Sequence, residues 1–210
     1  MIAIGFHAPS TALRHGCFHG WKPFGPLRKV TRCVGNVLHE LDGQPALDVY
    51  ARYLGEHARD LPASGLLFPF EMLGRDQSAM GLIRTILDVD RSAGTLTLAG
   101  DIIDQGYLRL MHATTDSLVE GAEAAAQAAL PEPANRSGDG LSLLFSCVGR
   151  KLVMGSRVDE EIDAIAAVFG ARSCVAGFYS NGEISPSMDG QHCHLHNQTM
   201  AIAHLYETTA

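Results

Sequence analysis

Two patterns of hydrophobic and polar positions alternate along the chain. Residues 81–102, GLIRTILDVDRSAGTLTLAGDI, carry two alternating runs on either side of the turn signal from Asp90 to Gly94, which predicts a β-hairpin. In residues 45–57, PALDVYARYLGEH, apolar side chains recur at helical spacing after a proline suited to a first turn. The hydrophobic pattern therefore predicts both β-strands and α-helices in the chain.

The remaining segments extend this alternation to the end of the chain. Residues 114–130 predict a helix capped by Thr114 or Thr115, and residues 159–170 predict a helix with acids in its first turn and Gly170 at its end. Further strands are predicted at 2–6, 29–41, 64–72, 106–113, 141–147, 174–180 and 198–206. Because strands come in groups separated by helices, we predict an α+β fold with a largely antiparallel sheet and three main helices packed on it.

Composition narrows the class of protein. The 210 residues are 46% hydrophobic, enough to fill a core, and the formal charge of −7 with only 16 scattered Lys and Arg disfavours a nucleic-acid surface. No apolar run approaches the roughly 18 residues that membrane insertion requires. Five cysteines without a C-x-x-C pair predict reduced thiols and a cytoplasmic location.

One stretch differs from the rest. Residues 177–200, GFYSNGEISPSMDGQHCHLHNQTM, concentrate a turn signal, three histidines, a cysteine and the tetrad His196 to Thr199. Together with LLFSCVGRKLVMG at 143–155 and HNQTMAIAHLYE at 196–207, this stretch resembles the C-terminal domain of the FIST family. The stretch 20–50 resembles the end of the family's N-terminal domain, so we expect residues 1–40 to be a remnant of that domain and 41–210 to form the C-terminal one.

The resemblance implies a sensory domain that binds a small ligand, with amino acids as the suggested class, in signal transduction. It implies no catalysis and no cofactor, and as protein partners it suggests a signalling protein or the missing part of an N-terminal domain. The family-like motifs fall on Cys147, Arg150, Phe178, Tyr179, Gly182, Glu183, His196, Asn197, Gln198 and Thr199.

The residues themselves suggest how an amino acid is held. Arg150 follows a buried strand, where its guanidinium would take a carboxylate, and Glu183 projects from the Asn181-Gly182 turn toward an ammonium, with Phe178 or Tyr179 beside the ligand. A structural role is the alternative: Arg150 ties a loop to an acid, and Glu183 braces its turn. Asn197 and Thr199 contact the ligand or satisfy backbone groups of the preceding loop.

Two other chemistries compete with ligand sensing. A thiol-dependent hydrolase would use Cys147 or Cys193 activated by a histidine, although Cys147 ends an apolar strand and also suits a buried core position. A metal-binding protein would use His192, His194 and His196, which share one face if the segment is extended. We expect a loop there, which disfavours the metal site.

Overall fold

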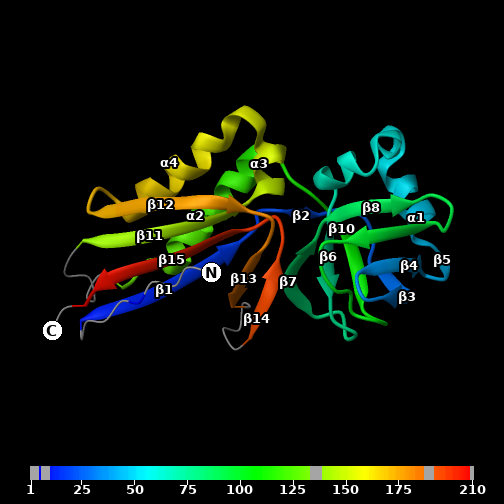
Figure 1. Cartoon of the computed structure of the whole chain (residues 1–210), viewed down its shortest axis with the longest axis horizontal. Helices are drawn as coiled ribbons and strands as arrows, with labels where there is room; N and C mark the ends of the chain where they lie inside the picture. Colours follow the sequence, from blue (N-terminus) through cyan, green and yellow to red (C-terminus); the bar gives the residue numbers. More distant parts are fainter. Residues whose placement is uncertain (1–4, 6–9, 133–138, 187–191, 209–210) are drawn as a thin grey trace.

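The computed structural model describes residues 5, 10–132, 139–186 and 192–208. Within them the strands form a four-stranded sheet, a nine-stranded sheet and a two-stranded hairpin. Figure 1 shows the two larger sheets side by side, with the hairpin between them. The predicted strand at 2–6 lies outside the described residues except for residue 5.

The four-stranded sheet contains strands from both ends of the chain. Its order is β1 (Thr11–Phe18), β15 (Met200–Glu207), β11 (Gly140–Cys147) and β12 (Ser173–Ser180). β1 pairs antiparallel with β15 over eight residues, and only β11 and β12 run parallel. A strand from the start of the sequence is thus an integral part of a sheet built mainly from its end.

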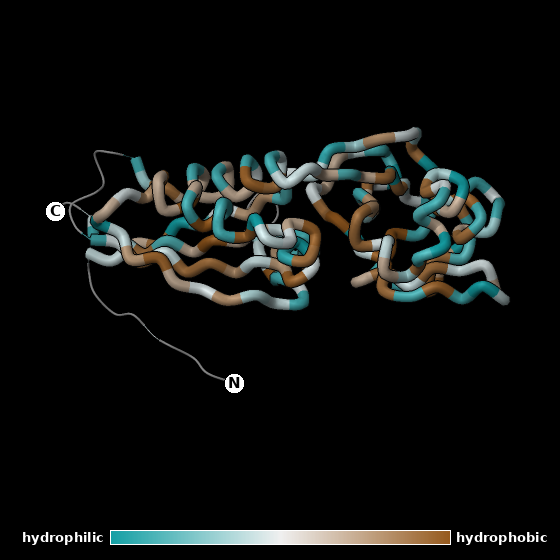
Figure 2. The backbone as a smooth tube through the Cα atoms, turned by 90° about the horizontal axis from the view of Figure 1, so that it is seen from above, coloured by the Kyte–Doolittle hydropathy of each residue, from teal (hydrophilic) through white to brown (hydrophobic). Residues whose placement is uncertain are grey.

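Three helices cover one face of this sheet. They are α2 (Thr115–Ala129), α3 (Val148–Met154) and α4 (Val158–Phe169), and Figure 2 shows them on the same side of the strands. Four alanines of α2, Ala122, Ala125, Ala126 and Ala129, are fully buried in one cluster with Leu144, Met200 and Ile202. Thr114 caps α2 by accepting the backbone N–H of Ser117. Small side chains let α2 lie close to the strands.

The opposite face of the sheet carries mostly apolar side chains and no covering helix among the described residues. Alternation along the paired strands places the following residues on it: Leu13, His15, Cys17, Leu141, Leu143, Phe145, Cys174, Ala176, Phe178, Ala201, Ala203 and Leu205. Leu13 and Phe178 are each 62% exposed. We call this surface the open face.

The second sheet has its own core. Along the sheet run β7 (Ala79–Arg84), β6 (Phe70–Leu73), β10 (Tyr107–His112), β3 (Arg28–Val34), β4 (Val37–Leu41), β9 (Thr95–Leu98) and β8 (Ile86–Asp90), with β2 (Lys22–Pro23) on β10 and β5 (Gln44–Pro45) on β4. α1 (Ala46–Leu54) packs Leu47, Tyr50 and Leu54 into that core. Two 3-10 turns, η1 (Gly55–Asp60) and η2 (Ala63–Leu67), follow α1, and a third, η4 (Gly155–Arg157), joins α3 to α4.

The hairpin of β13 (Glu183–Pro186) and β14 (Cys193–His196) links the two sheets. Arg84 at the end of β7 donates from Nη1 to the carbonyl oxygen of Leu195 at 3.0 Å. Just past the hairpin, Gln198 Nε2 lies 3.4 Å from the carbonyl oxygen of Leu66. The first contact connects the polar stretch at 177–200 with the nine-stranded sheet, and the second connects it with η2.

The structure confirms the α+β class with antiparallel sheets and corrects three local predictions. Residues 148–154 form α3, so Arg150 lies on a helix and not at a strand end. Residues 63–67 form η2, and the strand predicted at 64–72 begins only at Phe70. Residues 193–196 form β14 where a loop was expected, because pairing with β13 satisfies their backbone groups.

Candidate functional site

A pocket of about 420 Å³ lies on the open face, where the β13–β14 hairpin approaches the sheet. We call it the sheet-face pocket. Its lining is mainly apolar, and the residues are Leu13, His15, Phe145, Phe178, Ser180, Gly182, Glu183, Ile184, Ser185, Pro186, Ala201, Ile202 and Ala203. Strands from both ends of the chain therefore build it.

Glu183 is the acidic residue of this lining. Its side chain is 4% exposed, and its carboxylate accepts a hydrogen bond from Ser180 Oγ at 2.7 Å and one from Thr199 Oγ1 at 2.8 Å. Burial raises the pKa of Glu183, and the two hydroxyl hydrogen bonds and the charge of Arg150 oppose that rise. The two hydroxyls fill two of the roughly four acceptor positions of the carboxylate, and the backbone N–H of Glu183 itself also stabilises its charge.

The neighbouring aromatic residues point in opposite directions. Phe178 lines the pocket and meets Phe145 edge to face, with ring centroids 5.2 Å apart. Tyr179 is its neighbour on the strand, and its ring centroid lies 4.5 Å from Nζ of Lys151, on α3. Alternation along β12 thus places Phe178, and not Tyr179, at the pocket.

Arg150 is fully buried and occupied by protein groups. Its Nε donates to Glu161 Oε2 at 2.8 Å and its Nη1 to the carbonyl oxygen of His19 at 2.5 Å, while Nη2 donates to the carbonyl oxygen of Leu118. Ser146 Oγ donates to the other oxygen of Glu161. The guanidinium therefore ties α3, α4, α2 and the end of β1 together, and it presents no surface to the sheet-face pocket.

Comparison with known families places the chain. A model described as FIST C domain matches residues 46–186, and one described as FIST N domain matches residues 1–44. The chain belongs to the FIST C domain family. Domains of this family are generally thought to sense small ligands in signal transduction. Comparison with curated proteins gives no match.

The division of this FIST protein at residues 40 and 41 stays a prediction. β1, from the N-terminal match, pairs along its length with β15, which follows both matches. β3 and β4 lie in the same sheet as β6 to β10. Strands from the two matched regions are thus interleaved in space. No helix within the described residues has the length and apolar character needed to cross a membrane.

Cys147 and Asn197 line a different cavity, of about 260 Å³, beside Leu66 and Thr85 of the nine-stranded sheet region. Asn197 Nδ2 donates to the carbonyl oxygen of His196 at 3.0 Å. Burial raises the pKa of the Cys147 thiol, and the charge of Glu183 adds to that rise, so the neutral thiol is favoured. This disfavours Cys147 as a nucleophile, and Cys193 lies exposed on β14.

The three histidines proposed as metal ligands do not form a cluster. His194 and His196 share one face of β14, opposite Ser185 and Glu183, and His192 precedes the strand. Across the described part of the chain, no three His, Cys, Asp or Glu side chains lie close enough to hold a metal ion. The geometry gives no support to His192, His194 and His196 as a metal site.

Sequence reasoning missed the contribution of β1. Besides Leu13 and His15, this strand supplies Cys17 to a second cavity of about 420 Å³, which we call the edge cavity and which His19, just after the strand, also lines. Its other lining residues are His15, Gly16, Phe18, Gly81, Ala128, Pro186 and His196. The alternation in residues 11–18 could have indicated a strand, but nothing local indicates that it pairs with the last strand.

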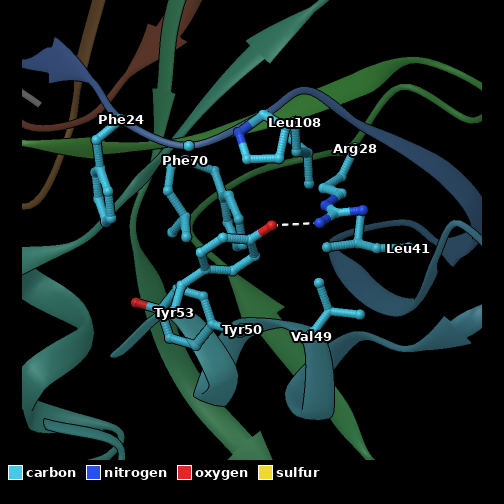
Figure 3. Close-up of a pocket in the computed structure, with 11 residues that line it drawn as sticks. Phe24, Arg28, Leu41, Val49, Tyr50, Tyr53, Phe70 and Leu108 are labelled. Carbon is cyan, nitrogen blue, oxygen red and sulfur yellow. Dashed lines mark hydrogen bonds between the residues drawn. The ribbon is translucent and has the colours of Figure 1, made fainter. Parts of the chain in front are cut away.

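A fourth cavity, shown in Figure 3, lies in the nine-stranded sheet. Arg28 points to the hydroxyl of Tyr53, its hydrogen-bond partner, above Tyr50 and Val49 of α1. Its volume of about 10 Å³ has room for roughly one water molecule. This cavity is too small for an organic ligand.

Proposed function

We propose that this FIST C domain is a sensory domain whose sheet-face pocket binds a small ligand with an ammonium group beside a compact apolar group. Amino acids and related amines form this class. The observation that carries the proposal is the carboxylate of Glu183, buried in an otherwise largely apolar pocket on a surface that no helix covers among the described residues.

The carboxylate defines what the pocket selects. A buried charge without a charged partner raises the free energy of the folded protein, and an ammonium group nearby compensates it. The hydroxyls of Ser180 and Thr199 orient Glu183 and leave acceptor positions for the N–H groups of a ligand. Such a charge-assisted hydrogen bond in a desolvated site is stronger than a neutral one.

The apolar walls define the rest of the ligand. Phe145, Phe178, Ala201 and Ala203 are among the residues that line the pocket. A pocket of about 420 Å³ is within the range for small molecules and exceeds what a single ammonium group needs. A branched aliphatic or aromatic side chain next to the ammonium would fill it.

The readout of binding also belongs to the proposal. We predict that the partner is a signalling protein or a further N-terminal segment and that the protein is cytoplasmic. Thiol-dependent hydrolysis is not favoured, because the buried Cys147 thiol lies at another cavity and is held neutral.

The test compares Glu183→Gln with the wild type by calorimetric titration of isopentylamine, leucine and leucinamide. We expect Glu183→Gln to weaken the binding of every ligand at least about tenfold, since it removes a charge-assisted hydrogen bond. Glu56→Gln is the matched control, because its carboxylate is 86% exposed and lies away from the pocket. Equal affinities for wild type and Glu183→Gln would exclude Glu183 as the binding group.

The same carboxyl makes binding depend on pH. Since its pKa is raised in the folded state, Glu183 contributes most to stability below the ordinary glutamate pKa, and this contribution is lost as pH rises through the raised value. An ammonium ligand prefers the ionised carboxylate, so we expect the ligand-induced rise in Tm to grow with pH over that window. Glu183→Gln should show neither trend, whereas a pH-independent ligand effect in the wild type would contradict the assignment.

A further inference from the structure

One residue of the edge-cavity lining, His196, has a buried acceptor without a partner among the described residues. His196 is 4% exposed, and its Nε2 lies 3.2 Å from the carbonyl oxygen of Ser185. A carbonyl oxygen only accepts, so Nε2 carries the proton and Nδ1 carries a lone pair. Within the described part of the chain, Nδ1 has no hydrogen-bond partner. A buried acceptor of this kind favours a ligand group that donates.

This acceptor lies next to Glu183. The two residues face each other directly across the β13–β14 hairpin, which places their Cβ atoms roughly 5 Å apart on one side of the hairpin. The sheet-face pocket and the edge cavity also share His15 and Pro186 in their linings. A ligand that spans these shared lining residues would lie near both side chains.

No free cation among the described residues beside His196 is available to hold a carboxylate: the charge of Arg84 reaches His196, but Arg84 donates to the carbonyl oxygens of Ile83, Asp101 and Leu195. None of the residues described as lining the edge cavity is Lys, Arg, Asp or Glu. Burial lowers the pKa of His196 and lowers that of His19 to about 4, so both imidazoles are neutral near pH 7. His19 Nδ1 already accepts the backbone N–H of Trp21, and Arg150 is occupied by Glu161.

We infer that the ligand pairs its ammonium group at Glu183 with an amide N–H at His196 Nδ1, so that the preferred ligand is an amino acid whose carboxyl group is an amide. The class comprises amino-acid amides and the first residue of a short peptide. This inference rests on the proposed function of Glu183. The lone pairs of a free carboxylate would repel the lone pair of Nδ1. An amide N–H of the ligand instead donates a hydrogen bond to Nδ1, and this N–H lies close to the ligand's ammonium group.

The test uses calorimetry to compare the affinity for leucinamide with that for leucine. Isopentylamine serves as the ligand with neither a carboxylate nor an amide, and leucylglycine serves as the peptide. In the wild type we expect leucinamide to bind about tenfold or more tightly than leucine, as one hydrogen bond and one relieved repulsion predict. Binding of leucylglycine at the level of leucinamide identifies a peptide end, and its failure to bind identifies the free amide.

Two substitutions at His196 separate ligand contact from structure. In His196→Gln the amide nitrogen takes the place of Nε2 and keeps a donor for Ser185 but removes the acceptor, so the preference for leucinamide should vanish. In His196→Asn the amide oxygen takes the place of Nδ1, so a folded variant should retain the preference. Thermal unfolding monitors whether each variant is folded.

The outcomes distinguish this inference from the proposed function. If Glu183→Gln abolishes binding but leucine and leucinamide bind equally to the wild type, the amide inference is wrong and the role of Glu183 stands. If His196→Gln keeps the preference for leucinamide, an ordered water satisfies Nδ1 and the inference is wrong. If no amine binds the wild type at all, the proposed function and the inference fail together.

Discussion

At the scale of single residues, two buried charges have opposite roles. Arg150 is satisfied within the protein by Glu161 and two carbonyl oxygens, whereas Glu183 is held by two hydroxyls and lines a pocket. A buried ion pair with all its donors used is a structural element. A buried carboxylate held only by neutral groups retains capacity for a cation, which is the basis for assigning it to the ligand.

Arg150→Ala tests this difference. We expect it to lower the free energy of unfolding by about 3–5 kcal/mol, because Glu161 is left buried without its partner. In protein that remains folded, the affinity for leucinamide should change less than about threefold, since such an indirect effect is worth well under one hydrogen bond. Denaturant unfolding and calorimetry measure the two quantities.

Two companion variants make the Arg150 result interpretable. Arg172→Ala removes an arginine that is 70% exposed and should leave stability nearly unchanged. The double variant Arg150→Met with Glu161→Leu removes both charges and should recover part of the lost stability. Normal stability with lost ligand binding in Arg150→Ala would instead favour Arg150 as the group that takes a ligand carboxylate.

The sequence indicated some of these residues and not others. Glu183 could be proposed from its turn signal, and Phe178 or Tyr179 from the family-like motif, but the choice of Phe178 needed the observed strand. The partners of Arg150 could not, because they come from α2, α4 and the end of β1. His15 and Cys17 were not proposed, since their role depends on a pairing between the two ends of the chain.

At the scale of elements, local patterns predicted what they determine. The hairpin of β8 and β9 and the helices α1, α2 and α4 follow from periodicity, turn residues and caps. α3 was missed because seven residues are too few to show a helical period. β14 was expected to be a loop because the run follows Gly190; in the strand that forms, His196 is buried while Leu195 is 40% exposed.

Gly16→Ala tests how α2 is seated on β1. A Cβ atom at Gly16 would lie 2.0 Å from the backbone oxygen of Ala125, which the close packing of α2 cannot accommodate. We expect a loss of at least about 2 kcal/mol in the free energy of unfolding, because the helix must move away from the strand. Thr11→Ala, on the exposed start of the same strand, should cost under about 1 kcal/mol. A neutral Gly16→Ala would show that α2 does not hold this position in solution.

At the scale of the whole molecule, the β13–β14 hairpin connects the ligand site to the nine-stranded sheet. One side of the hairpin carries Glu183 and His196, and its backbone at Leu195 accepts a hydrogen bond from Arg84. The topology behind this arrangement could not be predicted from the sequence, because β1 and β15 pair across nearly the whole chain. Local signals carry no information on such long-range pairing.

The last prediction concerns transmission from the ligand site to the second sheet. A ligand held by both Glu183 and His196 would restrict the hairpin, and Arg84, which also donates to the carbonyl oxygens of Ile83 and Asp101, would extend that restriction to β7. We expect saturating leucinamide to slow amide hydrogen exchange in β13, in β14 and at residues 79–84 and 99–102. The protection at the two distant segments is the signal of interest.

Arg84→Met removes the three donors while keeping the aliphatic stem of the side chain. It should abolish the protection at 79–84 and 99–102 and leave that of the hairpin, with affinity changed by less than about threefold because the pocket keeps its contacts. Arg75→Met is the matched control, since Arg75 donates to the carbonyl oxygen of Asp104 on an exposed part of the same sheet. If the distant segments stay protected in Arg84→Met, the two sheets are coupled by another route, such as the contact of Gln198 with Leu66. If protection in the wild type is confined to the hairpin, ligand binding does not affect the second sheet.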